Sequence, residues 1–215
     1  MIQREKKIFI LRHGETEQNR MGIVQGSGVD SSLNIMGEKQ SQLFFEKYKS
    51  ERFDFIICSN LMRSYQTIKR FELLGIPIRK DERLNEICWG EHEGKTGEVE
   101  LMMKYNRIIQ SWCAGNFQDK PAGGESAEEL GQRLDHFLRD IQNLEFNQIL
   151  ICTHGRTLRA LITKIKNIPL SAMEDIKHQN TGLYVAALKS DNWTVNVEND
   201  TTHLTHELNA SDIRG

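Results

Sequence analysis

The sequence predicts an α/β fold in which helices cover both faces of a mostly parallel sheet, a three-layer α/β/α sandwich. Short unbroken apolar runs alternate with amphipathic helical patterns along most of the chain, and such runs are typical of strands buried on both faces. The first run, residues 8–11, leads directly into Arg12, His13 and Gly14. Between about 84 and 124 the alternation stops, which indicates a helical insertion.

Local patterns predict each element in turn. Strands are expected at 8–11, 53–58, 76–78 and 148–152, followed by two late strands, antiparallel at an edge, at 182–188 and 193–197. Helices are expected from the cap residue Asn34 to 48, from the cap chemistry of Ser59-Asn60 to Gly75, from 99 to 112, from a capping box at 126–129 to 144, and from 155 to 165.

Composition limits the classes of partner. The 215 residues carry 28 Lys and Arg against 30 Asp and Glu, a net charge of −2, and no dense basic block, which argues against a nucleic-acid partner. The apolar run before Arg12 is too short for a secretory signal, and no stretch reaches the ~20 apolar residues of a membrane span. We therefore expect a cytoplasmic protein with no membrane partner and reduced cysteines.

Four polar residues follow the predicted strands closely. His13 and His154 each lie two residues past a buried run and precede a glycine; Arg63 falls in the first turn of the helix after the second strand, and Glu86 follows the third. Because the carboxyl ends of parallel strands share one edge of a sheet, these side chains are expected to meet in one crevice with Arg12.

That set of residues indicates phosphoryl chemistry. Two guanidiniums and helix N-termini bind a phosphoryl group, because forked donors match its oxygens and the helix dipole favours negative charge. A neutral imidazole is a competent nucleophile, and a carboxylic acid can protonate a leaving oxygen and then activate water. The sequence shows no metal-ligand cluster, so we expect arginines to neutralise charge where Mg²⁺ does so elsewhere.

Arg12-His13-Gly14-Glu15-Thr16 resembles the signature of the histidine phosphatase (phosphoglycerate mutase-like) superfamily. The resemblance continues in family order from residue 8 to about 188, through Asn19, SNLMRSYQT at 59–67, 84–94, GGES at 123–126 and THG at 153–155. It implies a phosphoglycerate mutase-like fold and one histidine phosphatase domain over residues 1–215, with a cap insertion at about 88–124.

The resemblance also implies roles. His13 would become phosphorylated, Glu86 would be the general acid and base, and His154 would hold the phosphoryl group with Arg12 and Arg63. Asn19 resembles a secondary phosphate contact. The expected set is therefore catalytic His13, Glu86 and His154, phosphate-binding Arg12, Arg63, Asn19 and Gly155, with no metal and no cofactor.

The resemblance leaves the reaction open between phosphatase and mutase. Cofactor-dependent mutases of this family usually carry Trp where Gln18 stands, and a longer basic insertion that grips a second acidic group. Here 99–121 offers only Lys104, Arg107 and Lys120. Residues 84–94 are similar to fructose-2,6-bisphosphatase-like and α-ribazole-phosphatase-like members. We favour a metal-independent phosphatase of small phosphorylated metabolites over a phosphoglycerate mutase, and both over a catalytically silent phospho-ligand binder.

Other features receive weaker interpretations. The Met/aromatic stripe at 99–112 is expected to pack on the main domain, although it could also line a pocket or serve a homodimer. His92, His136 and His178 receive no role from their positions. A metal pair at His203 and His206 is disfavoured because no further ligands lie nearby in sequence. The last fifteen residues are polar, and a loosely held terminus is expected.

Overall fold

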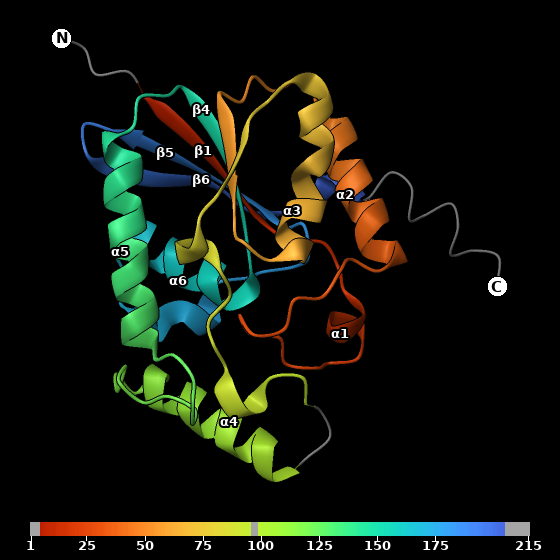
Figure 1. The fold of residues 1–215 in the computed structure, drawn as a ribbon. Coiled ribbons are helices and arrows are strands. Elements are labelled where there is room, and N and C mark those ends of the chain that lie inside the picture. The colour runs from red at the N-terminus through yellow and green to blue at the C-terminus, as the bar shows by residue number, and fades with distance from the viewer. Residues whose placement is uncertain (1–4, 96–98, 205–215) are drawn as a thin grey trace.

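The computed structural model describes residues 5–95 and 99–204 and shows a three-layer α/β/α sandwich (Figure 1). The central sheet has six strands in the order β3-β2-β4-β1-β5-β6. The strands are β1 (Lys6–Arg12), β2 (Phe55–Cys58), β3 (Ile78–Lys80), β4 (Gln148–Thr153), β5 (Leu183–Lys189) and β6 (Asn192–Asp200).

Four strands are parallel and two are not. The pairs β1–β4, β2–β4 and β2–β3 are parallel, whereas β5 runs antiparallel to β1 and β6 antiparallel to β5. The predicted fold class and the predicted antiparallel pair at the edge are both confirmed. Because β5 is antiparallel, it begins at the same edge where β1 ends.

The α-helices are α1 (Glu17–Arg20), α2 (Ile35–Tyr48), α3 (Met62–Ile68), α4 (Val99–Cys113), α5 (Ala127–Asn143) and α6 (Gly155–Ile165). Short 3-10 segments occupy Lys69–Leu74, Glu82–Leu84, Gly90–His92, Leu170–Asp175 and Thr202–Leu204. Figure 1 shows α5 and α6 on one face of the sheet and α2 and α3 on the other.

Alternate residues of β1 face opposite sides of the sheet, and both sides are covered, which explains why its apolar run is unbroken. Ile8 and Ile10 pack into the core beneath α5 and α6, and Phe9 and Leu11 pack into the core beneath α2. All four side chains are at most 2% exposed. Since successive residues of a strand face opposite sides, a strand covered on both faces needs an apolar residue at every position.

The capping box at 126–129 is confirmed: the Ser126 hydroxyl accepts from the Glu129 N–H, and the Glu129 carboxylate accepts from the Ser126 N–H. The cap prediction for α3 is wrong. Leu61 occupies the cap position without a side-chain bond, and Asp30, from a distant loop, accepts from the Met62 N–H at 2.6 Å.

The helix predicted at 99–112 forms α4, which lies at one end of the molecule beyond α5 (Figure 1). Its stripe divides between two faces. Trp112 is 1% exposed, and Tyr105 packs against the core, whereas Met102 and Met103 are 47% and 67% exposed. The packing prediction is thereby confirmed for the aromatic residues of the stripe and is wrong for the two methionines. The single domain with a cap at about 88–124, and the homodimer, stay predictions.

Among residues 5–95 and 99–204, no helix is both long and apolar enough to cross a bilayer. His206 and residues 205–215 of the polar terminus lie outside the described residues. His203 is buried at 5% exposure, and its Nε2 lies 3.0 Å from the Thr181 hydroxyl, so its ring packs into the domain.

Candidate active site

A cavity of about 150 Å³ lies where β1 and β4 end. It collects side chains from widely separated segments, as the crevice prediction requires. Its lining comprises Arg12, His13, Asn19, Val24, Gln25, Arg63, Glu86, Trp89, Tyr105, Gly155, Arg156 and His178. Six of the seven predicted site residues are therefore in this lining; His154, the seventh, lies directly behind it.

His13 is fixed by the end of β1. Its N–H donates to the Thr153 carbonyl of β4 at 2.9 Å, which extends the parallel pairing by one residue. The ring Nδ1 lies 2.7 Å from the Gly14 carbonyl, so Nδ1 carries the proton and donates. The other nitrogen, Nε2, is left with its lone pair at the cavity.

The surroundings of His13 keep the ring neutral. Burial, followed by the positive charges of Arg63 and Arg12, holds its pKa well below the ordinary value of 6.5. The ring is therefore uncharged at neutral pH, with its one proton on Nδ1, and this is the form in which an imidazole can act as a nucleophile.

Arg12 presents an unused donor at the cavity. One of its terminal nitrogens donates to the His178 carbonyl at 2.6 Å, but its buried Nε has no hydrogen-bond partner among residues 5–95 and 99–204. Burial lowers the pKa of Arg12 to about 10, so the group remains charged at neutral pH. Because buried donors are nearly always paired, an unpaired guanidinium N–H here points to an anionic ligand.

Arg63 joins α3 to the glycine-rich loop before α2. Its side chain is fully buried and donates to the carbonyls of Val29 at 2.6 Å and Gly26 at 3.2 Å. Its Nε–H donates to His154 Nδ1 at 3.1 Å. Three of its five N–H groups are therefore paired, and two remain for a ligand.

His154 has partners for both ring nitrogens. Nδ1 accepts from Arg63, so Nε2 carries the proton and donates to the Ser59 hydroxyl at 2.7 Å. The ring centroid lies 5.0 Å from that of His13. In this arrangement His154 orients Arg63 and packs on His13.

The N-terminus of α6 holds Glu86. Its Oε2 accepts from the Arg156 N–H and its Oε1 from the Thr157 N–H, both at 3.0 Å, and the Thr157 hydroxyl also donates to Oε1. A carboxylate at a helix N-terminus is stabilised by the dipole and by otherwise unpaired N–H groups. This helix therefore fixes Glu86 at the cavity wall.

Asn19 and Gly155 complete the predicted set. Asn19 accepts from the Thr16 N–H with Oδ1 and so forms half of a capping box for α1. At Gly155 a Cβ would lie 3.0 Å from the His178 ring and 3.6 Å from Arg12 Nε. A side chain at 155 would therefore press on the His178 ring and lie in ordinary contact with the unpaired donor.

His178 belongs to the site, contrary to the sequence interpretation, which gave it no role. The segment before β5 reaches the cavity because β5 starts at the edge where β1 ends. Asn180, in the same segment, donates to the His13 carbonyl at 3.0 Å. Burial, and then the charge of Arg12, lowers the pKa of His178 to about 3. The one available sequence signal was a polar cluster immediately before an apolar run.

A family model, the histidine phosphatase superfamily (branch 1), matches residues 8–201. The chain belongs to this superfamily. Its relatives include phosphoserine phosphatase 1 of Hydrogenobacter thermophilus, 28% identical over 200 residues that cover 92% of this chain and 94% of that protein. Another is a probable phosphoglycerate mutase GpmB of Photorhabdus laumondii, 30% identical over 210 residues, with coverage of 92% and 94%.

Among solved structures, Bacillus stearothermophilus YhfR superposes with a TM-score of 0.81 at 26% identity, covering 93% of this chain and 99% of that one. The superfamily assignment and the observed sheet agree, so the phosphoglycerate mutase-like resemblance of the sequence is confirmed at the level of family and fold.

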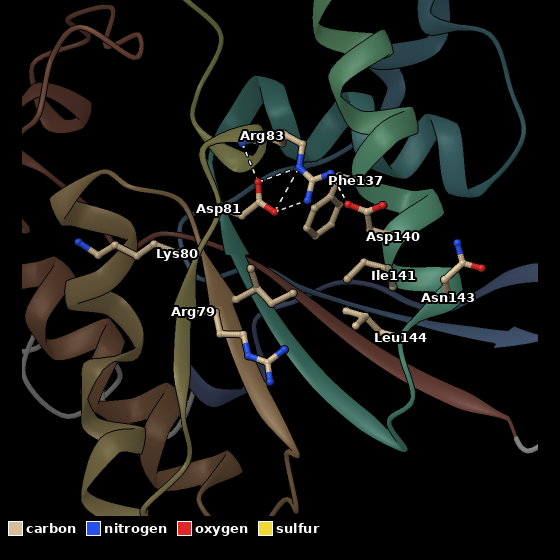
Figure 2. A pocket seen from close by; sticks show the side chains of 10 residues that line it. Arg79, Lys80, Asp81, Arg83, Phe137, Asp140, Ile141, Asn143 and Leu144 are labelled. Atoms are coloured by element: carbon tan, nitrogen blue, oxygen red, sulfur yellow. Dashed lines mark hydrogen bonds and ion pairs between the residues drawn. The ribbon is translucent and has the colours of Figure 1, made fainter.

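A second cavity, of about 420 Å³, lies between β3 and α5 (Figure 2). Arg83 in its wall forms ion pairs with Asp81 and Asp140, both at 2.6 Å. Its lining contains no histidine or cysteine. Across residues 5–95 and 99–204, no three His, Cys, Asp or Glu side chains are grouped as metal ligands.

Proposed function

We propose that this member of the histidine phosphatase superfamily is a metal-independent phosphomonoester hydrolase that acts on small phosphorylated metabolites through a phosphohistidine intermediate. One observation carries the proposal: the Nδ1 hydrogen bond of His13 directs the lone pair of Nε2 into a cavity that also holds the unpaired Nε–H of Arg12. A nucleophile and an anion-binding donor thus face the same small volume.

In the first step, His13 Nε2 attacks phosphorus in line with the ester oxygen. The N–P bond forms as the P–O bond to the leaving group breaks, and Glu86 transfers its proton to the departing oxygen. The Gly14 carbonyl, which accepts from Nδ1–H, stabilises the positive charge that the phosphorylated ring acquires.

In the second step, Glu86, now a carboxylate, takes a proton from water as the water oxygen attacks phosphorus. The N–P bond breaks, inorganic phosphate leaves, and His13 returns to its neutral form. Arg12 and Arg63 neutralise the phosphoryl oxygens throughout, which is the role that a divalent cation takes in other phosphoryl transfers. His154 supports this step by orienting Arg63.

Mutase activity is the second candidate, because several relatives are named probable phosphoglycerate mutase GpmB. The basic side chains of the cap do not favour it. Lys104, Arg107 and Lys120 are all absent from the lining of the cavity, and Lys104 pairs with Glu91 and Glu100 while Lys120 pairs with Glu129. A weak hold on a bisphosphate lets the first product leave and water enter.

The proposal is tested by turnover of p-nitrophenyl phosphate. His13→Ala is expected to reduce kcat by at least ~10³-fold, because the attacking atom is lost. His136→Ala, at an exposed histidine of α5, is the matched control and should retain activity. Activity of the parent enzyme should survive EDTA. Retained turnover in His13→Ala would overturn the nucleophile, and loss in EDTA would overturn metal independence.

A further inference from the structure

The segment that precedes β5 holds the end of β1 at three points. A terminal nitrogen of Arg12 donates to the His178 carbonyl at 2.6 Å, and the Thr181 N–H donates to the Arg12 carbonyl at 3.1 Å. Asn180 Nδ2 donates to the His13 carbonyl at 3.0 Å. The proposed phosphoryl transfer assigns no task to Asn180, although this side chain contacts the residue that carries the nucleophile.

Thr181 fixes the backbone of this segment. Its φ of 53° lies in the left-handed region, which a β-branched residue rarely adopts. Such a conformation persists only where the surroundings determine it. Thr181 is fully buried, and its hydroxyl donates to the Asn180 carbonyl at 2.8 Å and lies 3.0 Å from His203 Nε2. The fold therefore sets the position of Asn180 before any ligand binds.

The partners of the Asn180 side chain determine its orientation and that of Asn19. The backbone N–H of Thr16 donates to one side-chain atom of Asn19 at 3.2 Å, so this atom must be the oxygen, Oδ1. Asn180 lies 3.3 Å from the same oxygen and must therefore also present a donor, its Nδ2. The His13 carbonyl, which can only accept, receives the second N–H of that group.

The two donors on Oδ1 determine which end of the Asn19 amide remains for a ligand. Asn19 lines the cavity at the ends of β1 and β4, and in the part of the chain that the structure describes its Nδ2 donates to no other group. A flipped amide would direct Oδ1 at the oxygens of a phosphoryl group and turn Nδ2 against the two donors. Asn180 does not line this cavity; it lines a neighbouring one of about 870 Å³ that shares Arg12 and His178. Asn180 can therefore act on a phosphoryl group only through the residues that it holds.

We propose that Asn180 is a positioning residue, which holds the amide of Asn19 with Nδ2 directed at the phosphoryl group. The His13 carbonyl anchors the Asn180 side chain while it does so. The inference rests on the proposed function, because it takes Asn19 as a contact of the phosphoryl group. A donor that is already oriented loses less conformational freedom when the ligand binds than one that must first turn. The segment before β5 thereby contributes to phosphate binding without touching the phosphate through Asn180.

The affinity for inorganic phosphate, measured by isothermal titration calorimetry, tests this role without requiring turnover. Asn19→Ala should raise the Kd for phosphate at least ~10-fold, the effect of losing a hydrogen bond to a charged group. Asn180→Ala should raise Kd ~3- to 10-fold in the parent protein but less than ~2-fold in the Asn19→Ala background, because it acts through Asn19. A loss that arises only from a weakened fold would be the same in both backgrounds. An equal factor in both, or no change in the parent protein, would overturn the inference.

Gln179→Ala is the matched control, since the Gln179 side chain accepts from Asn199 at 3.0 Å and does not line the cavity that holds Asn19; its Kd should equal that of the parent. If Asn180→Ala does not fold by circular dichroism, Asn180→Asp decides, because a carboxylate keeps the shape but cannot donate, and an unchanged Kd would overturn the inference. Turnover of p-nitrophenyl phosphate separates the two proposals. Uncoupled phosphate binding with normal turnover overturns the positioning role alone, whereas coupled binding without turnover overturns the proposed phosphatase function.

Discussion

Glu86 serves two opposite tasks in the proposed reaction, as an acid toward the leaving group and as a base toward water. Its two oxygens accept from N–H groups of Ile87, Arg156 and Thr157, each at 3.0 Å. These three contacts come from backbone atoms, and the Thr157 hydroxyl adds a fourth from a side chain. A glutamine at 86 can keep a carbonyl oxygen at the Oε1 position, but its amide nitrogen cannot accept from the Arg156 N–H and cannot deliver the proton.

Glu86→Gln is therefore expected to discriminate between leaving groups. For an alkyl phosphate, whose alkoxide leaves poorly, kcat/KM should fall by ~10²- to 10⁴-fold, the usual range for a lost general acid. For p-nitrophenyl phosphate the loss should be much smaller, because nitrophenolate departs without a proton. Steady-state kinetics on both substrates provide the check. Equal losses would contradict leaving-group protonation by Glu86.

At the scale of elements, the loop at 22–30 is the support of Arg63. Gly26 and Val29 offer their carbonyls to its guanidinium, and Asp30 accepts from the first N–H of α3. The loop is held from the other side by Glu93, whose Oε2 accepts from the Gly28 N–H at 2.9 Å. A Cβ at Gly26 would lie 1.7 Å from Glu93 Oε1 and 2.9 Å from the Ile87 carbonyl.

Gly26→Ala should therefore displace this loop and loosen Arg63. We expect kcat/KM for p-nitrophenyl phosphate to fall by ~10- to 100-fold, the effect of a misplaced binding group, with a smaller relative change in thermal stability because the loop lies outside the core. Ser27→Ala, in the same loop, is the matched control. Full activity in Gly26→Ala would show that Arg63 does not depend on this loop.

Buried neutral histidines affect the stability of the whole molecule. Burial lowers the pKa of His203 from 6.5 to about 4, and burial also places that of His13 well below 6.5. In the unfolded chain these rings take up protons near pH 6.5. Because the unfolded state then binds more protons than the folded state, the free energy of unfolding falls as pH drops from 6.5 towards 4.

His203→Gln should flatten this pH dependence. One histidine whose pKa falls from 6.5 to about 4 contributes ~3 kcal/mol to the loss between neutral pH and pH ~4. The variant should therefore lose that much less over the interval, even if its stability at neutral pH is lower. Urea unfolding at several pH values measures the slope. His136→Gln, at an exposed position, is the control. A slope identical to that of the parent would contradict the assignment.

Much of the molecule could be predicted from local sequence. The two exceptions, the cap of α3 and the contribution of His178, both depend on contacts between loops that are distant in sequence. The buried runs identified the sheet because strands such as β1 need apolar residues at every position. The same runs placed His13, Glu86 and Arg63 at one edge. The α3 cap from Asp30 and the contribution of His178 depend on which loops meet in three dimensions, and that follows from the antiparallel entry of β5 and the path of the loop at 22–30.

The central claim is that His13 becomes phosphorylated during turnover. Mixing the enzyme with excess phosphomonoester, quenching under denaturing alkaline conditions that preserve phosphohistidine, and mapping the modification by mass spectrometry test it directly. We expect a phosphoryl group on His13 that forms within one turnover and is absent in His13→Ala. It should accumulate in Glu86→Gln with p-nitrophenyl phosphate because water activation is impaired. Turnover without any phosphorylated His13, or phosphorylation at another residue, would contradict this claim.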